Sequence, residues 1–193
     1  MPSVRGFIAW LRESFEKRRM KGAPAAKDIR ELLNEMAPEF QFEQMDEDVE
    51  NPNEIQKDKL HSPVDYKILY KKKLVWYMDV TRQPTYSYKE AGDNNIRISI
   101  PKVSFGKGEL VFGHFKINGD LDVYLVYDLA KDLSITLGER CIWITIKKAL
   151  HYGEWGDTNR TNASQQTNLE VHKTHWNQGL ESLVQEWRKR IEN

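Results

Sequence analysis

Hydrophobic and polar positions alternate along the chain from residue 64, and this pattern predicts β-strands. The stretch VDYKILYKKKLVWYMDVT is the clearest case, with Lys72 as its one exception. Its apolar face consists of Tyr66, Ile68, Tyr70, Leu74, Trp76, Met78 and Val80. We therefore expect one long strand or a bulged pair of strands here. The same alternation returns at Ile96, Ile98 and Ile100.

A tight hairpin is predicted around Asn118-Gly119. These two residues tolerate the positive φ angles of a type I′ turn, and they separate the alternating runs LVFGHFKI and DLDVYLVYDL. We expect this hairpin to pair Phe115 and Ile117 with Leu121 and Val123. The run ERCIWITIKKAL predicts one further strand.

Apolar positions recur at helical spacing in three other segments. The first follows the N-capping residue Ser3 and places Val4, Phe7, Ile8, Leu11 and Phe15 on one face. The second begins with the capping-box pattern of Asp28 and Glu31 and ends before Pro38. The third closes the chain as an amphipathic helix with Trp176, Leu180, Leu183, Val184, Trp187 and Ile191.

These elements predict an α+β fold in three parts. Residues 1–37 form an N-terminal helical arm with a basic amphipathic helix. Residues 38–62 form an acidic flexible linker, because a stretch such as EQMDEDVENPNEIQKD buries too little apolar area to offset its ordering entropy. Residues 63–193 form a mostly antiparallel, β-rich globular domain that is closed by a C-terminal helix.

Charge distribution distinguishes the two ends of the N-terminal third. The 29 basic and 29 acidic residues cancel over the whole chain, so an electrostatic partner must be met by a local patch. Residues 1–27 hold seven Lys or Arg against two Glu, a net charge of +5. Residues 28–58 hold two basic against eleven acidic residues, a net charge of −9.

The single cysteine and the absence of long apolar runs bear on the compartment. Cys141 lies in the apolar run CIWITI and has no second cysteine to pair with, which indicates a buried thiol in a reducing compartment. No stretch reaches the length of a membrane span. We expect a cytoplasmic protein, in the host cytoplasm if it is viral, peripheral on the inner membrane face or in the virion.

Catalytic signatures are weak. His172 and His175 stand three residues apart, but no second pair completes a four-ligand metal site. Cys141 sits in the middle of a strand-like run, and no serine lies in a GxSxG setting. The glycines of SFGKGEL lack the spacing of a phosphate-binding loop. The sequence therefore predicts no enzyme, no catalytic residue, no metal, no cofactor and no small-molecule substrate.

The basic N-terminal helix is the first candidate binding site. An interfacial helix needs an apolar face to enter the headgroup region and cations to meet anionic lipid. The alternative is that its apolar face docks on the domain or on another copy of the chain. The residues predicted to bind membrane are Arg5, Phe7, Trp10, Leu11, Arg12, Phe15, Lys17, Arg18, Arg19 and Lys21.

The second candidate site is the lysine run within the first long strand. Lys71, Lys72 and Lys73 lie near Tyr70 and Trp76, so cations could follow phosphates while aromatic rings stack on bases. An edge strand protected by charge explains the same run equally well.

Two aromatic-rich stretches, YKKKLVWYMDVTRQPTYS and KINGDLDVYLVYDL, follow the basic segment and the acidic tether. This layout resembles the matrix proteins of rhabdoviruses. The resemblance implies that the basic N-terminal region binds the inner membrane leaflet and the nucleocapsid. It does not extend to budding motifs, because the chain contains no PPxY or P(T/S)AP sequence.

The leading hypothesis is a non-enzymatic viral structural protein of the matrix kind, found in the virion. It would self-associate as a homo-oligomer, bind an anionic membrane surface and bridge it to the viral nucleocapsid or RNA during assembly. The alternative is an intracellular module that binds single-stranded RNA or protein, in which the first helix only packs on the domain. A third reading is an enzyme whose site the sequence does not flag, with His172 and His175 as the first candidates.

Overall fold

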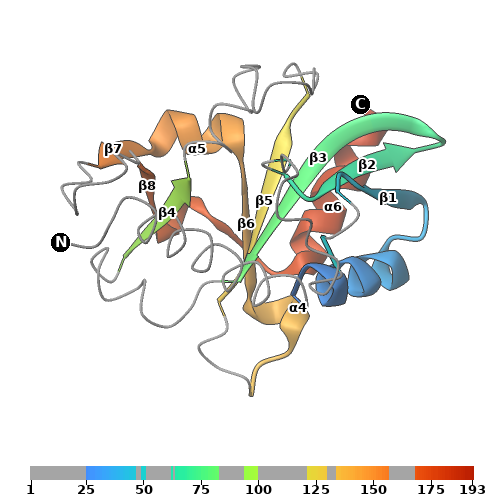
Figure 1. The fold of residues 1–193 in the computed structure, drawn as a ribbon, viewed down its shortest axis with the longest axis horizontal. Coiled ribbons are helices and arrows are strands. Elements are labelled where there is room, and N and C mark those ends of the chain that lie inside the picture. The colour runs from blue at the N-terminus through green and yellow to red at the C-terminus, as the bar shows by residue number, and fades with distance from the viewer. Residues whose placement is uncertain are drawn as a thin grey trace, which may run out of the picture.

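The computed structural model describes residues 25–46, 49–50, 62, 64–82, 94–99, 121–129, 134–156 and 168–193. A six-stranded sheet lies in the middle of these residues (Figure 1). A helix over residues 25–36 and the C-terminal helix cover one face of the sheet, and a short helix with a three-stranded sheet covers the other. The predicted α+β class, with mostly antiparallel sheets and a closing C-terminal helix, is confirmed.

The large sheet has the strand order β1-β2-β3-β5-β6-β9. Neighbouring strands are antiparallel except β3 and β5, which run parallel. A parallel pair needs a crossover connection, and here residues 83–122 supply it, including β4 of the second sheet. The strands are β1 (Phe40–Gln44), β2 (Tyr66–Tyr70), β3 (Lys73–Arg82), β5 (Val123–Asp128), β6 (Cys141–Thr145) and β9 (Asn177–Gln178).

The small sheet is antiparallel, with β8 between β4 and β7. Its strands are β4 (Asn95–Ser99), β7 (Glu154–Gly156) and β8 (Asn168–His172). The helical elements that follow β4 are α4 (Leu137–Arg140), α5 (Ile146–Tyr152), the 3₁₀ turn η2 (Lys173–His175) and α6 (Leu180–Glu192). Thr145 caps the N-terminus of α5, where its hydroxyl accepts a hydrogen bond from the Lys148 amide.

Two cores form because both faces of the large sheet are covered. On one face, Ile29 and Leu33 of the first helix and Trp187 of α6 pack against sheet residues such as Trp76 and Tyr124. The rings of Trp76, Tyr124 and Trp187 lie within 6.4 Å of one another, centroid to centroid. This aromatic cluster ties the C-terminal helix to the centre of the sheet.

The second core lies between the large and the small sheet. Tyr77, Leu125 and Ile144 extend from the large sheet, and Ile98 and Leu169 meet them from the small one. β5 and β6 are therefore buried on both faces, which explains why their sequences VYLVYD and CIWIT are almost uniformly apolar. The predicted burial of the Cys141 thiol is confirmed.

The stretch with seven alternating apolar residues is a hairpin, with a register shift between Ile68 and Leu69. Lys71 and Lys72 form its two-residue turn with φ angles of 49° and 64°. Lys72 interrupts the alternation because it belongs to the turn and not to a strand. The predicted lysine run is thus displayed at a hairpin tip, where Lys71, Lys72 and Lys73 are all exposed.

The structure describes only part of the N-terminal third, so it bears on only some of the predictions made there. All ten predicted membrane-binding residues, from Arg5 to Lys21, lie outside the described residues, as does the predicted turn at Asn118-Gly119. The described part of the predicted arm packs in the first core, and β1 lies inside the range predicted as a linker. The three-part division stays a prediction. In the described ranges, no helix has the length and hydropathy needed to cross a bilayer.

Candidate functional site

Two large aromatic side chains stand out of the surface close together in the sequence. Tyr152 is 47% exposed at the end of α5, and Trp155 is 50% exposed in β7. Large aromatic side chains are usually buried, as most of those described here are. Exposed rings on neighbouring elements are therefore candidates for binding.

The Tyr152 ring lies flat on the His175 imidazole. Their centroids are 4.2 Å apart, the planes differ by 3°, and His151 meets the Tyr152 ring edge at 4.6 Å. His175 is held in place by the 3₁₀ turn η2, in which His172 Nδ1 lies 2.9 Å from the Thr174 hydroxyl. The tyrosine is thus supported from behind, and its orientation is fixed.

Trp155 is positioned by the turn between α5 and β7. The Gly153 amide donates to the Ala149 carbonyl at 2.8 Å and ends the helix. A Cβ atom at Gly153 would lie 2.6 Å from that carbonyl oxygen and 2.7 Å from Leu169, so only glycine fits. Trp155 then pairs with Leu169 across β7 and β8.

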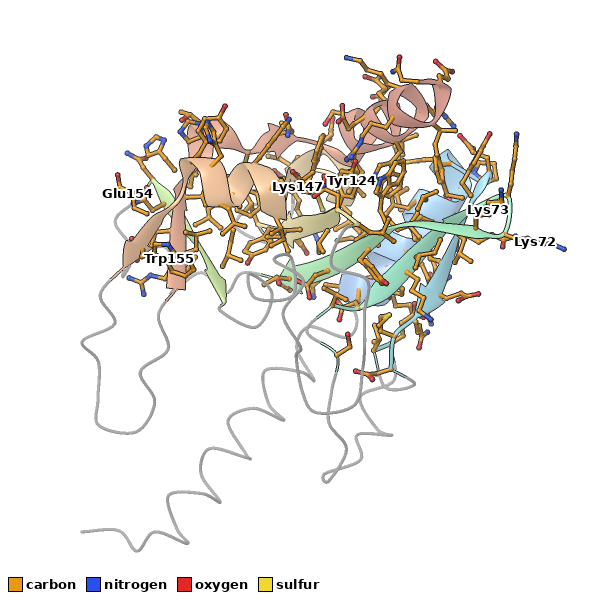
Figure 2. All side chains as sticks on the ribbon, turned by 90° about the horizontal axis from the view of Figure 1, so that it is seen from above. Lys72, Lys73, Tyr124, Lys147, Glu154 and Trp155 are labelled. Carbon is orange, nitrogen blue, oxygen red and sulfur yellow. The ribbon has the colours of Figure 1, made fainter. Side chains whose placement is uncertain are left out.

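Two lysines lie at the other end of the same short helix. Lys147 and Lys148 are exposed in the first turn of α5, and Figure 2 shows Lys147 on this helix, with Glu154 and Trp155 beyond its far end. We name this site the α5 surface, and its residues are Lys147, Lys148, His151, Tyr152, Trp155 and His175. It combines flat rings with cationic side chains.

A charged cluster lies at the start of β5, on the face that α6 covers. Arg190 Nη1 lies 3.0 Å from Asp122 Oδ2 and 2.6 Å from the Tyr124 hydroxyl. Asp122 is only 6% exposed, and its other carboxylate oxygen accepts a hydrogen bond from the Val123 amide. Burial raises the pKa of Tyr124 above its ordinary value although Arg190 opposes that shift, so the phenol stays neutral. We name these three residues the Asp122 cluster.

The α5 surface and the Asp122 cluster lie at the same end of the β5–β6 pair. Tyr124 is opposite Thr145 in this antiparallel pair, and α5 begins at the next residue, Ile146. The start of β5 and the start of α5 are therefore neighbours at one end of the sheet, with α6 and Arg190 on one face and α5 on the other. Arg190 is one-third exposed, so it is the member of the cluster that solvent and ligands reach.

The structure gives different roles to His172 and His175, the two histidines that the sequence analysis weighed as a metal pair without predicting a metal site. His172 ends β8 and caps η2, whereas His175 supports Tyr152. Within the ranges that the structure describes, no group of three or more His, Cys, Asp or Glu side chains could hold a metal ion.

The sequence analysis predicted neither the α5 surface nor the Asp122 cluster, and the nucleic-acid site that it did predict lies elsewhere. Lys72 and Lys73 of the predicted nucleic-acid site lie at one end of the described part of the molecule, and Glu154 and Trp155 lie at the opposite end (Figure 2). Tyr152 and Trp155 were not predicted, because the stretch HYGEW carries no signal of exposure. Its only hint was a glycine between two aromatic residues.

Of three comparisons with known proteins, the comparison with solved structures found a match. No known family model matches the chain, and no curated protein matches it. Among solved structures, the chain is similar to D212, a nuclease from a fusselovirus, at 11% sequence identity and a TM-score of 0.45. That match covers 99% of this chain and 98% of the other.

The prediction of a rhabdovirus-like matrix protein is wrong. The matched structure is a viral nuclease, so it contradicts the matrix family, the non-enzymatic function and the membrane-assembly role together. The two aromatic-rich stretches behind the resemblance were misleading, because alternating apolar residues indicate only that one face of a strand is buried. In this fold YKKKLVWYMDVTR comprises the end of β2, the lysine-containing turn and β3, and β3 packs between two helices on one face and the second sheet on the other.

Proposed function

We propose that this chain binds and processes single-stranded nucleic acid, with unpaired bases on the α5 surface and the backbone beside the Asp122 cluster. The observation that carries the proposal is the half-exposed Tyr152 ring stacked on His175, with Trp155 three residues further on. The proposal rests on the described side chains of this chain.

Base stacking is the chemistry that such rings offer. Every base has a flat π-face, and each base stacked on an aromatic side chain contributes about 1–3 kcal/mol. His175 behind Tyr152 keeps the ring from rotating away, so less side-chain entropy is lost when a base arrives. An unpaired strand is required, because bases inside a duplex already stack on each other.

Phosphates have cationic partners near the start of α5, at the end of the α5 surface away from Tyr152 and Trp155. Lys147 and Lys148 are exposed in the first turn of α5, next to the end of the sheet where Arg190 lies. Asp122 and Tyr124 hold the Arg190 guanidinium by two of its hydrogen bonds. A fixed guanidinium neutralises the charge that develops on a phosphodiester during transfer, so Arg190 is the group that we assign to the reacting phosphate.

Binding is tested by fluorescence anisotropy with labelled single-stranded and duplex oligonucleotides. We expect preference for the single strand, and Tyr152→Ala with Trp155→Ala should weaken it by about 10-fold or more, given about 1–3 kcal/mol per stacked base. The matched control is Ile135→Ala, because Ile135 is similarly exposed but precedes β6 whereas α5 follows it. Equal binding by the aromatic and control variants would reject the α5 surface.

Processing is tested on denaturing gels, with Mg²⁺ or Mn²⁺ supplied to the same strands. We expect cleavage that Arg190→Gln abolishes and Arg190→Lys reduces. Melting temperatures of both variants identify any loss that comes from unfolding. Binding without cleavage under all these conditions would reject the processing half of the proposal and leave the binding half intact.

A further inference from the structure

We infer that the lysine turn of the β2–β3 hairpin is a second binding point for the phosphates of a nucleic-acid strand. We define the lysine turn as Lys71, Lys72 and Lys73. The inference rests on the proposed function for the choice of nucleic acid as the ligand. It concerns a surface that shares no residue with the α5 surface or the Asp122 cluster.

The backbone of the turn is unusual for its sequence. Tyr70 and Lys73 are paired across the hairpin, so only Lys71 and Lys72 connect the strands. Both have positive φ angles, 49° and 64°. Turns of this type favour Asn and Gly, because other side chains bring Cβ too close to the backbone in the left-handed region.

The contacts of the turn with the described residues do not explain its positive φ angles. All three lysines are exposed. Within the described ranges, a ring contact places Lys71 Nζ 5.1 Å from the centroid of Tyr70, and none of the ion pairs there involves these lysines. Strained residues that lack a structural reason cluster at functional sites. Asn at position 71 and Gly at position 72 would suit this backbone but would carry no positive charge. The positive charge is therefore what the two lysines add to the turn.

The ligand chemistry follows from three ammonium groups on consecutive residues. They repel one another, and a partner with repeated negative charges relieves that repulsion. Tyr70 supports the turn from below, since its ring lies 5.5 Å from that of the buried Phe40. A strand of nucleic acid supplies phosphates at regular intervals, and it displaces counterions when lysines neutralise them.

The distance between the two surfaces gives the inference its sharpest consequence. Lys72 and Lys73 lie at the end of the molecule opposite Glu154 and Trp155, with Tyr124 and Lys147 between them (Figure 2). A short strand reaches one surface only, whereas a long strand contacts both. The lysine turn should therefore matter for long strands and hardly at all for short ones.

The test replaces the turn with the residues that its backbone favours, in the full chain. We expect Lys71→Asn with Lys72→Gly to raise the melting temperature and to weaken binding of a strand of about 30 nucleotides by about 10-fold at low salt. Two lost phosphate contacts should reduce the slope of log K against log salt by about 1.4. A strand of about 6 nucleotides, within the site size of one small binding surface, should bind as before.

The matched control is Lys71→Arg with Lys72→Arg, which keeps both charges and the strain. It should bind the long strand like the natural chain. Unchanged long-strand binding by the Asn-Gly variant would overturn the inference. So would displacement of the strand by polyglutamate at equal charge concentration, since any polyanion would then suffice.

The two proposals fail separately. Loss of short-strand binding in Tyr152→Ala with Trp155→Ala, together with no effect of Asn-Gly, would overturn the lysine turn and support the α5 surface. The reverse pattern would overturn the α5 surface and leave the lysine turn as the nucleic-acid site.

Discussion

Asp128 and Arg140 form a buried ion pair where β5 ends and β6 begins, with Arg140 Nε 2.7 Å from Asp128 Oδ1. Arg82 approaches the other carboxylate oxygen at 3.0 Å, so β3, β5 and α4 meet at one fully buried carboxylate. The hydrogen bond to Asp128 raises the pKa of Arg140, which keeps its charge at all accessible pH values.

Arg140→Met should destabilise the fold by about 2–4 kcal/mol, because it removes the guanidinium that contacts both oxygens of a fully buried carboxylate. Urea unfolding at neutral pH measures the change. The control is Arg188→Met, since Arg188 pairs with Glu39 at the surface and both side chains are at least one-third exposed. A loss in Arg140→Met no greater than in the control would show that the buried pair contributes nothing net.

Glu50→Gln should reduce stability at neutral pH and flatten its dependence on acid. Burial alone would raise the pKa of Glu50, but hydrogen bonds from Arg30 and Tyr66 outweigh it and hold the pKa below its ordinary value. A carboxylate with a lowered folded-state pKa stabilises the fold above its unfolded value of about 4.3, and this contribution disappears as pH falls through the folded-state value. The difference between natural chain and variant should therefore shrink from about pH 5 downward.

Urea midpoints at neutral pH, near pH 5 and near pH 3 measure that difference. Glu31→Gln is the matched control, because Glu31 is half-exposed and contacts Lys27 and Arg30 only at 3.6 Å or more. A Glu50→Gln difference that stayed constant across the series would mean that Glu50 does not titrate with folding.

Cys141 should not react with thiol reagents in the folded protein at pH 8. Burial raises the pKa of the Cys141 thiol to about 12, helped by the nearby Asp128 carboxylate, so the reactive thiolate is scarce as well as inaccessible. A colorimetric disulfide-exchange reagent should detect no thiol under native conditions and one per chain in denaturant. Rapid reaction of the native protein would place Cys141 outside the core.

Gly153→Ala should lower both stability and nucleic-acid binding. The added methyl carbon would lie 2.6 Å from the Ala149 carbonyl oxygen and 2.7 Å from Leu169, well inside van der Waals contact, so the turn between Tyr152 and Trp155 must shift. We expect a loss of about 1–3 kcal/mol, typical of overpacking. Gly138→Ala is the control, because its nearest neighbour, Leu32, would be 3.5 Å away. Normal nucleic-acid binding by Gly153→Ala would show that binding at the α5 surface does not depend on the geometry of this turn.

Local pattern determined much of this protein. The amphipathic stretch that ends in Ile191 is α6 from Leu180 onward, whereas Trp176, predicted on the same helix, precedes it and packs in the second core. The alternation from Tyr66 to Val80 marks the face in the first core, except for Leu74, which packs against the second. Of the run ERCIWITIKKAL, which was predicted as one strand, only Cys141–Thr145 is a strand, and it is buried; the rest belongs to α4 and α5. These features were readable because the period of the hydrophobic positions reports, over a few residues, which side of an element leaves water.

Tertiary structure alone decided which elements meet. The parallel pairing of β3 with β5 joins segments about forty residues apart. Tyr152 stacks on His175 although β7 and β8 lie between them in the sequence, and Arg190 of the C-terminal helix reaches Asp122 beside β5. Periodicity cannot encode such partners, because burial constrains each element without naming its neighbour. The candidate sites consist of these long-range contacts and of exposed side chains, and exposure is the property that an apolar pattern predicts least.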